Sequence, residues 1–231
     1  MPVMARLEPK STSDSVDHLK QVACRLFAER GVDGVTVRQI AEAAGQKNHA
    51  AVGYHFGSKE HLIRELVLDG AMLIEERRDA WLSALEAKGP PARARDVIDI
   101  LTRAAVEPPM LGLADSYNRF IVMLAMTHRS FFMDVLGAQW SASYVRCLEH
   151  LRRLMPNMPA ADKTQRFRFM GAMMGSVLAA RDEELWGEAQ QYTSHAPDWS
   201  SEHTIAHLVQ MMEAIIMAPY EGAARTEFSA P

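Results

Sequence analysis

The sequence has few of the features that define several common protein classes. Its 231 residues include only two cysteines, Cys24 and Cys147, which are far apart and in no CxxC pair, so neither a disulfide framework nor a zinc finger is encoded. The longest stretch without a charged residue, 169–180, is too short for a membrane span, which needs about twenty residues. The amino terminus lacks the basic region and apolar core of a signal peptide. These absences predict a cytoplasmic protein with no transmembrane helix.

Signatures of catalysis and cofactor binding are also missing. No GxSxG, HExxH, P-loop or dinucleotide-binding pattern occurs, and strand signals are nearly absent. His203 and His207 are four residues apart and can share a helix face as metal ligands, but no third ligand accompanies them, so a polar helix edge is the better interpretation. The sequence therefore predicts a protein that is not an enzyme and that uses no cofactor or metal.

Composition and charge narrow the class further. Hydrophobic residues make up 48% of the chain and charged residues 23%, which is close to the globular average. The formal net charge is −4, yet residues 1–64 carry nine Lys and Arg against seven Asp and Glu. Because phosphate binding depends on local cations, the amino-terminal quarter is the part expected to face a polyanion.

Helical periodicity and capping signals organise this quarter. An apolar face recurs from residue 16 to 27, and Gly31 follows it in the position that a helix carboxyl cap favours. Thr36 and Gln39 have the spacing of a capping box, which predicts a second, short helix that stops at Gly45.

A third short helix is predicted after the turn at Gly45. Val52 and Phe56 lie four residues apart as its inward anchors, Gly57 closes it, and Ser58 can cap a long fourth helix. Three short helices in about fifty residues, with the second and third joined by a tight turn, describe a helix-turn-helix unit. Its expected partner is double-stranded DNA, because such a third helix fits the major groove.

Three fragments resemble the DNA-binding domain of the TetR family of transcriptional regulators: LFAERG at 26–31, TVRQIAEAAG at 36–45 and YHFGSKE at 54–60. The resemblance covers roughly residues 13–62. It implies a homodimeric regulator, usually a repressor, that binds a palindromic operator and responds to a small-molecule effector. Compared with the common family pattern, the segment between Gly45 and Phe56 is one residue longer, and Gly53 stands where an aromatic residue often contacts phosphate.

Periodicity and the resemblance together predict an all-α fold of about nine helices. Proline and glycine divide the all-helical remainder of the chain. We expect a flexible arm at 1–12, a helix-turn-helix DNA-binding domain at 13–62, a larger helical domain for ligand binding and dimerisation at 63–220, and a flexible tail at 221–231.

Groups suited to DNA contacts gather around the predicted second and third helices. Asn48 and His49 are candidates for base-edge contacts, because amide and imidazole groups can hydrogen-bond in the major groove. Lys59 and Thr36 are candidates for phosphate contacts, although Thr36 also serves as a cap and His55 can instead brace the third helix. The full predicted DNA-binding set is Thr36, Arg38, Lys47, Asn48, His49, Ala50, Tyr54, His55 and Lys59.

Methionine and aromatic side chains of the middle segment adapt well to an irregular apolar guest, although they also fill ordinary cores. As a set they favour an apolar or amphipathic effector over a sugar or a nucleotide. The predicted effector-binding residues are Trp81, Tyr117, Phe120, Met123, Met126, Phe131, Trp140, Tyr144, Phe169 and Met173.

Two broad apolar stripes near the carboxyl terminus predict a homodimer that pairs as a four-helix bundle. Their residues are Phe167, Met170, Gly171, Met174 and Leu178 in one stripe, and Ile205, Leu208, Val209, Met212 and Ile216 in the other. Two alternatives to a regulator stay open. One is a helical ligand-binding or protein-interaction module that no longer reads DNA, and the other is an all-helical enzyme that converts its guest.

Overall fold

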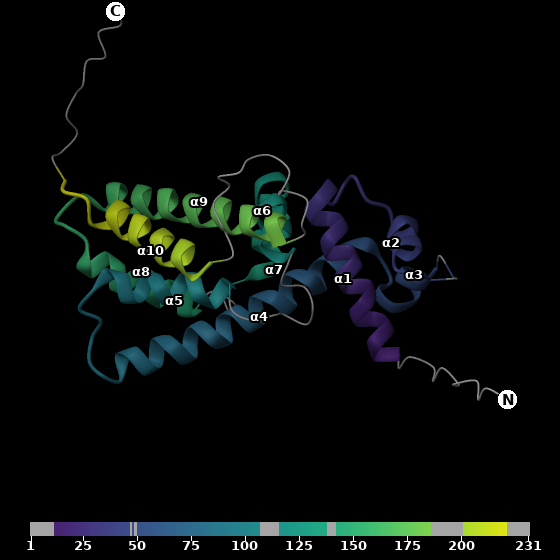
Figure 1. Cartoon of the computed structure of the whole chain (residues 1–231), viewed down its shortest axis with the longest axis horizontal. Helices are drawn as coiled ribbons and strands as arrows, with labels where there is room; N and C mark the ends of the chain where they lie inside the picture. The colour runs from purple at the N-terminus through teal and green to yellow at the C-terminus, as the bar shows by residue number, and fades with distance from the viewer. Residues whose placement is uncertain are drawn as a thin grey trace, which may run out of the picture. The chain divides into compact units, whose positions relative to one another are not determined.

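The computed structural model describes residues 12–46, 48, 50–106, 116–137, 142–185 and 201–220, and these form ten α-helices and no strand. The predicted all-α fold is therefore confirmed, with one helix more than expected (Figure 1). The helices are α1 (Thr12–Arg30), α2 (Val37–Ala43), α3 (Ala51–Phe56), α4 (Lys59–Glu86), α5 (Ala94–Val106), α6 (Tyr117–Thr127), α7 (Arg129–Leu136), α8 (Ala142–Leu154), α9 (Ala160–Leu185) and α10 (Glu202–Met217).

The chain divides into two compact units. The first comprises Met1–Ala71 and Pro108–Leu136, and so contains α1 to α3, the start of α4, α6 and α7. The second comprises Met72–Glu107 and Gly137–Pro231, and contains the rest of α4 with α5 and α8 to α10. The first unit is larger than the predicted DNA-binding domain because α6 packs against α1 and α7 packs against α6. Residues 1–11 of the predicted arm and the predicted tail lie outside the described residues.

The core of the first unit is built from the apolar face of α1 and its neighbours. The Phe27 ring of α1 stacks on the Phe120 ring of α6, with 5.9 Å between ring centroids. Both side chains are fully buried, as are Ile40 of α2 and Leu62 of α4. Aromatic pairs at this separation stabilise a core beyond the area they bury. The amino-terminal helices thus rest on α6, a helix that comes much later in the chain.

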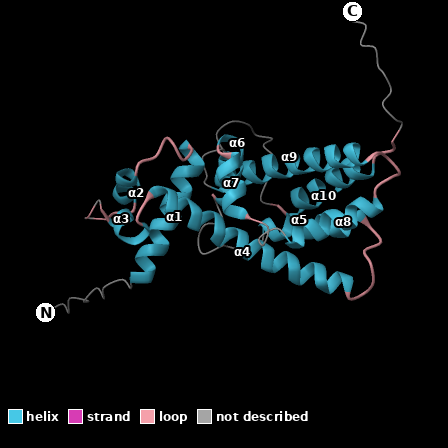
Figure 2. Cartoon of the chain, turned by 180° about the vertical axis from the view of Figure 1, so that it is seen from behind, coloured by secondary structure: helices cyan, strands magenta, loops and turns pink. Residues whose placement is uncertain are grey.

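In the second unit α9 and α10 run side by side, α10 packs on α5, and α5 packs on α8 (Figure 2). Leu101, Leu151, Met170 and Met212 bring these four helices into one apolar core. The guanidinium of Arg166 on α9 closes the end of α10, donating to the carbonyl oxygens of residues 216 and 218 at 2.9 and 2.6 Å. Such cationic donors satisfy the last carbonyls of a helix and complement its dipole.

Candidate nucleic-acid interface

The start of α2 has the predicted capping box. The backbone N–H of Gln39 donates to Thr36 Oγ1 at 3.3 Å, and the backbone N–H of Thr36 donates to Gln39 Oε1 at 2.8 Å. Both residues are exposed, so the cap secures the helix end while leaving it open to a large ligand. Arg38 follows on the same surface, paired with Glu42 at 2.7 Å, and this hydrogen bond raises the pKa of Arg38.

The helix α3 has one buried side and one bare side. Ala51, Val52 and Phe56 are buried, which confirms the two predicted inward anchors, whereas Gly53 and Tyr54 are exposed. Tyr54 is 83% exposed and makes an edge-to-face contact with His55, which is half-buried. The bare side of α3 therefore offers a phenol and an accessible stretch of backbone to a partner.

The turn between α2 and α3 is closed by Asn48. Its Oδ1 accepts from the backbone N–H of Ala50 at 2.9 Å, and its backbone oxygen accepts from the N–H of Ala51 at 3.0 Å. These bonds satisfy the start of α3, where the cap residue Ala50 has no side-chain acceptor. Asn48 therefore caps the start of α3, and its side chain is also exposed; a contact between Asn48 and a base edge stays a prediction. Lys47 and His49 lie outside the described residues.

Lys59 has a structural role that its sequence position does not reveal. Its ammonium donates to the backbone oxygens of Val32 and Val35 at 2.9 and 3.0 Å, and the side chain is half-buried. The first residue of α4 thereby holds the connection between α1 and α2. Phosphate contact by Lys59 stays a prediction, and any phosphate would share the ammonium with these two carbonyls.

Replacing Lys59 by methionine is expected to lower the free energy of unfolding by about 2 kcal/mol, because two carbonyl oxygens lose a charged donor. Urea unfolding of Lys59→Met beside Lys88→Met, which removes an exposed lysine, measures the difference. Unchanged stability of Lys59→Met would show that these two hydrogen bonds contribute nothing.

The predicted effector residues are divided between the two units. Tyr117, Phe120, Met123, Met126 and Phe131 belong to the first unit, and Trp81, Tyr144, Phe169 and Met173 to the second. Phe120 is fully buried in the core, whereas Met126 is 80% exposed and Phe169 is 53% exposed. Trp140 lies outside the described residues. Phe131 belongs to this set and lines a hollow of about 240 Å³ in the first unit, together with Leu124 and His128.

The structure corrects the residues assigned to a dimer surface. Eight of the ten are buried within this single chain: Phe167, Met170, Leu178, Ile205, Leu208, Val209, Met212 and Ile216. All of them except Ile205 belong to the apolar core that joins α9 and α10 to α5 and α8, so the apolar stripes face the chain's own core rather than a second copy. Gly171 and Met174 are half-buried. Any dimer surface on α9 and α10 must use the opposite sides of these helices.

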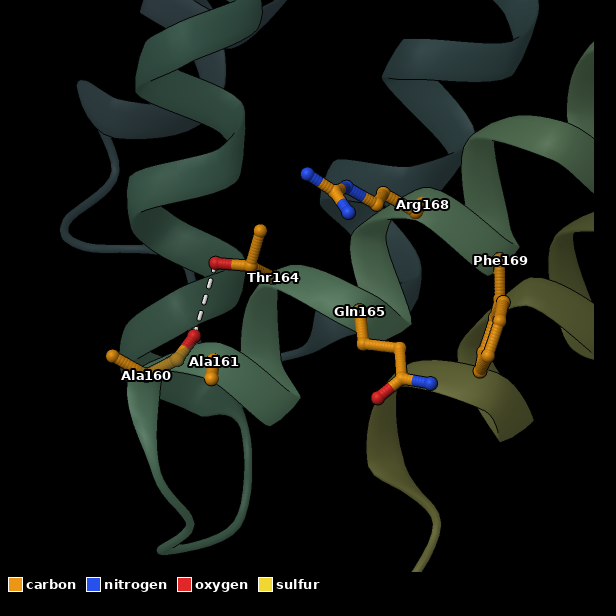
Figure 3. A pocket seen from close by; sticks show the side chains of 6 residues that line it. All are labelled: Ala160, Ala161, Thr164, Gln165, Arg168 and Phe169. Carbon is orange, nitrogen blue, oxygen red and sulfur yellow. Dashed lines mark hydrogen bonds between the residues drawn. The ribbon is translucent and has the colours of Figure 1, made fainter.

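The opposite side of α9 is open near its start. Figure 3 shows a hollow there lined by Ala160, Ala161, Thr164, Gln165, Arg168 and Phe169. The Thr164 hydroxyl donates to the backbone oxygen of Ala160 at 2.9 Å, within the first turns of α9 (Figure 3). The lining thus combines three small side chains with the longer Gln165 and Arg168 and with the exposed Phe169 ring.

Two further observations concern membrane-spanning helices and metal ligands. Within the described ranges, no helix is both long and apolar enough to cross a membrane. No group of three or more His, Cys, Asp or Glu side chains in the described part of the chain is placed to hold a metal ion. The rings of His203 and His207 lie 6.2 Å apart on α10.

The helical fold and the capped pair α2 and α3 define a helix-turn-helix protein, and comparison with known proteins agrees. Residues 20–66 match the family model described as bacterial regulatory proteins, tetR family. The HTH-type transcriptional repressor KstR2 of Mycolicibacterium smegmatis is 38% identical over 66 residues, which are 29% of this chain and 32% of the relative. The HTH-type transcriptional regulator AcrR of Shigella flexneri is 23% identical over 83% of this chain and 91% of the relative.

Among solved structures, a mutant of the HlyIIR protein shares the fold with a TM-score of 0.60 at 13% identity, covering 92% of this chain and all of that one. The match to the tetR family model is confined to the amino-terminal segment, residues 20–66, which contains α2 and α3. The two relatives are described as a transcriptional repressor and a transcriptional regulator. The KstR2 match spans about a third of that relative's length.

Proposed function

We propose that this chain is a dimeric transcriptional regulator, a repressor by analogy with KstR2, that binds a palindromic operator through α2 and α3. The observation that carries the proposal is that one side of α3 is buried and the other side is exposed. Its inner side is anchored by Val52 and Phe56, and its outer side is bare at Gly53 and Tyr54. A helix with a fixed position and a free polar side suits insertion into the major groove.

The charges and donors around this helix support a phosphate-lined partner. Thr36 and Arg38 are exposed at the start of α2, and Asn48 is exposed in the turn before α3. Hydroxyl, guanidinium and amide groups are the donors that meet phosphates and base edges. We therefore keep Thr36, Arg38, Asn48 and Tyr54 as the contacts on which the DNA hypothesis depends.

A dimer follows from the size of the reading unit. One helix of six residues contacts too few base pairs for a specific site, whereas two related by a twofold axis combine their selectivity over half-sites roughly 34–36 Å apart. The outer side of α9 supports this, because the large apolar ring of Phe169 is exposed there. On α10, Met211 and Met217 are also exposed.

The proposed effector is a small apolar or amphipathic molecule that releases the operator. It can do so only through a difference in its affinity for the operator-bound and free conformations of the protein. The helix α4 begins directly after the helix-turn-helix unit and continues into the second unit, so it is the element expected to connect the two sites.

Selection of bound fragments from a genomic library, followed by a salt series on the recovered site, tests DNA binding. We expect a palindromic site whose affinity falls steeply with salt concentration, because cationic groups displace counterions from phosphates. Tyr54→Ala should weaken operator binding roughly tenfold without a loss of stability, because the phenol contacts little of the protein.

Met133→Ala is the matched control, since it removes a 52% exposed side chain from α7 of the same unit, outside every predicted site. Its operator affinity should equal that of the wild type. Recovery of no preferred sequence, or equal operator affinities of Tyr54→Ala and the wild type, would argue for the interaction-module alternative or for a different reading surface.

A further inference from the structure

Arg78 of α4 is a buried cation with an unused donor. The residue is 9% exposed, and a terminal nitrogen of its guanidinium donates to Glu75 Oε2 at 3.2 Å. Its Nε is buried without a hydrogen-bond partner. Burial lowers the pKa of Arg78, an effect that the nearby Glu75 charge opposes, and the group stays protonated.

Glu75 is held in place by a different element. Its two carboxylate oxygens accept from the backbone N–H of Ser143 at 2.6 Å and from the Ser143 hydroxyl at 2.8 Å. Ser143 is buried in the first turn of α8, where free backbone donors attract a carboxylate. Because Glu75 is fixed by α8, it meets Arg78 through one guanidinium nitrogen and leaves Nε without an acceptor.

A buried donor on a charged group is costly to leave unpaired. Guanidinium and carboxylate or phosphate groups commonly meet through two parallel hydrogen bonds. The Nε–H group of Arg78 is therefore a donor to which an oxyanion can bind.

The surroundings of this donor are mainly apolar. The guanidinium carbon of Arg78 lies 5.6 Å from the centroid of the Tyr144 ring, and burial raises the pKa of Tyr144. Cys147 is fully buried, and Tyr144 and Met173 pack against the same apolar core. An apolar group attached to an acceptor at Arg78 would therefore match Tyr144 and Cys147.

We propose that Arg78 binds the headgroup of the effector, and that the effector is an amphipathic molecule with an oxyanion, a carboxylate or a phosphate, on an apolar chain. The proposal rests on the proposed function as an effector-controlled regulator and narrows its ligand class. Arg78 lies on α4, the helix that starts after the helix-turn-helix unit, so occupation of this site acts on the element that leads to the DNA-binding helices.

Arg146 of α8 provides a matched control. It contacts the same segment of α4, where its guanidinium pairs with Asp79 and Glu86 and is about one-third exposed. Both arginines therefore pair with carboxylates at the contact between α4 and α8. Arg146 differs in having two carboxylate partners and no buried unpaired nitrogen in the described structure.

Calorimetric titration of the full chain with decanoate, decyl phosphate, decan-1-ol and decyltrimethylammonium, each below its aggregation concentration, tests the headgroup. We expect one or both anions to bind at least tenfold more tightly than the alcohol and the cation. Arg78→Met should remove this preference, and Arg146→Met should keep it. The two anions distinguish a carboxylate from a phosphate source.

A second measurement on the wild type guards against misfolding of Arg78→Met. In a spectrum of ¹⁵N-labelled arginine side chains, the Nε–H resonance that Arg78→Lys removes should shift on addition of the preferred anion and stay in place with decan-1-ol. Equal binding of anions and alcohol, no binding of either anion, or an anion preference that survives in Arg78→Met would overturn the proposal. Operator binding is measured separately, so selective DNA retention without anion binding would reject this inference and leave the proposed function standing.

Discussion

Replacing Gly70 by alanine is expected to lower the free energy of unfolding of the first unit by about 3 kcal/mol, because the new methyl group has no room. A Cβ atom built at Gly70 lies 2.0 Å from the Cζ atom of Tyr117. The Tyr117 ring is 4% exposed, and its hydroxyl donates to the backbone oxygen of Val67 at 3.0 Å. The ring is therefore held against α4 and cannot retreat without losing this bond and repacking beside Phe120.

Urea unfolding of Gly70→Ala beside Gly53→Ala measures the effect with a matched substitution. Gly53 lies in α3 with no atom within 4 Å of an added Cβ, so its replacement should raise stability by roughly 1 kcal/mol through helix propensity. In the double variant Gly70→Ala, Tyr117→Leu, a smaller side chain replaces the ring. The double variant should therefore lose less stability than the sum of the losses of the two single variants. Equal stabilities of Gly70→Ala and the wild type would show that α6 can move away from α4 at little cost.

Placing a charge at Phe169 is expected to abolish dimerisation and to weaken operator binding by about a hundredfold or more. Phe169 is 53% exposed on the outer side of α9, so Phe169→Glu should leave the fold intact. In the proposed dimer the ring would be buried by a second copy, and an unpaired carboxylate is costly to bury there. A monomer would hold a single half-site, which loses most of the affinity for a palindrome.

Sedimentation velocity and operator titration of the same samples test this expectation. Val145→Glu is the control, because it adds the same charge at a 49% exposed apolar residue of α8 in the same unit. The control should remain dimeric and bind the operator like the wild type. A Phe169→Glu protein that still sediments as a dimer would place the dimer surface elsewhere on the molecule.

The helix-turn-helix unit was predictable because its boundaries depend on short-range signals. Gly31, Gly45 and Gly57 all adopt positive φ, of 71°, 66° and 72°, where each predicted helix ends. The Ser58 hydroxyl accepts from the backbone N–H of His61 at 3.0 Å, as expected of a cap for the long fourth helix. Such signals involve residues three or four apart, so the sequence contains all of the partners.

Residues with long-range partners were less predictable. The position of Lys59 predicts a phosphate contact, but it does not reveal that the ammonium also binds backbone oxygens 24 and 27 residues earlier in the chain. Gly70 drew no prediction from the sequence, although a glycine inside a helix is an available sign of a close contact. The sequence also gives no sign that Arg78 is a candidate site. Its burial and the hydrogen bond from Ser143 to Glu75 both depend on the packing of α4 on α8.

The apolar stripes of α9 and α10 show most clearly where local reasoning ends. Periodicity identifies a stripe and places it on one side of a helix, but it does not say which surface covers it. In the folded chain, the core with α5 and α8 covers Met170 and Met212, and Phe169 is left outside. The helix boundaries and the helix-turn-helix unit could thus be predicted from the residues alone, because local hydrogen bonding and spacing determine them. The resemblance to the tetR family was visible in the same short fragments. The partner of each apolar face was decided only by tertiary packing, because burial depends on which distant segments compete for the same surface.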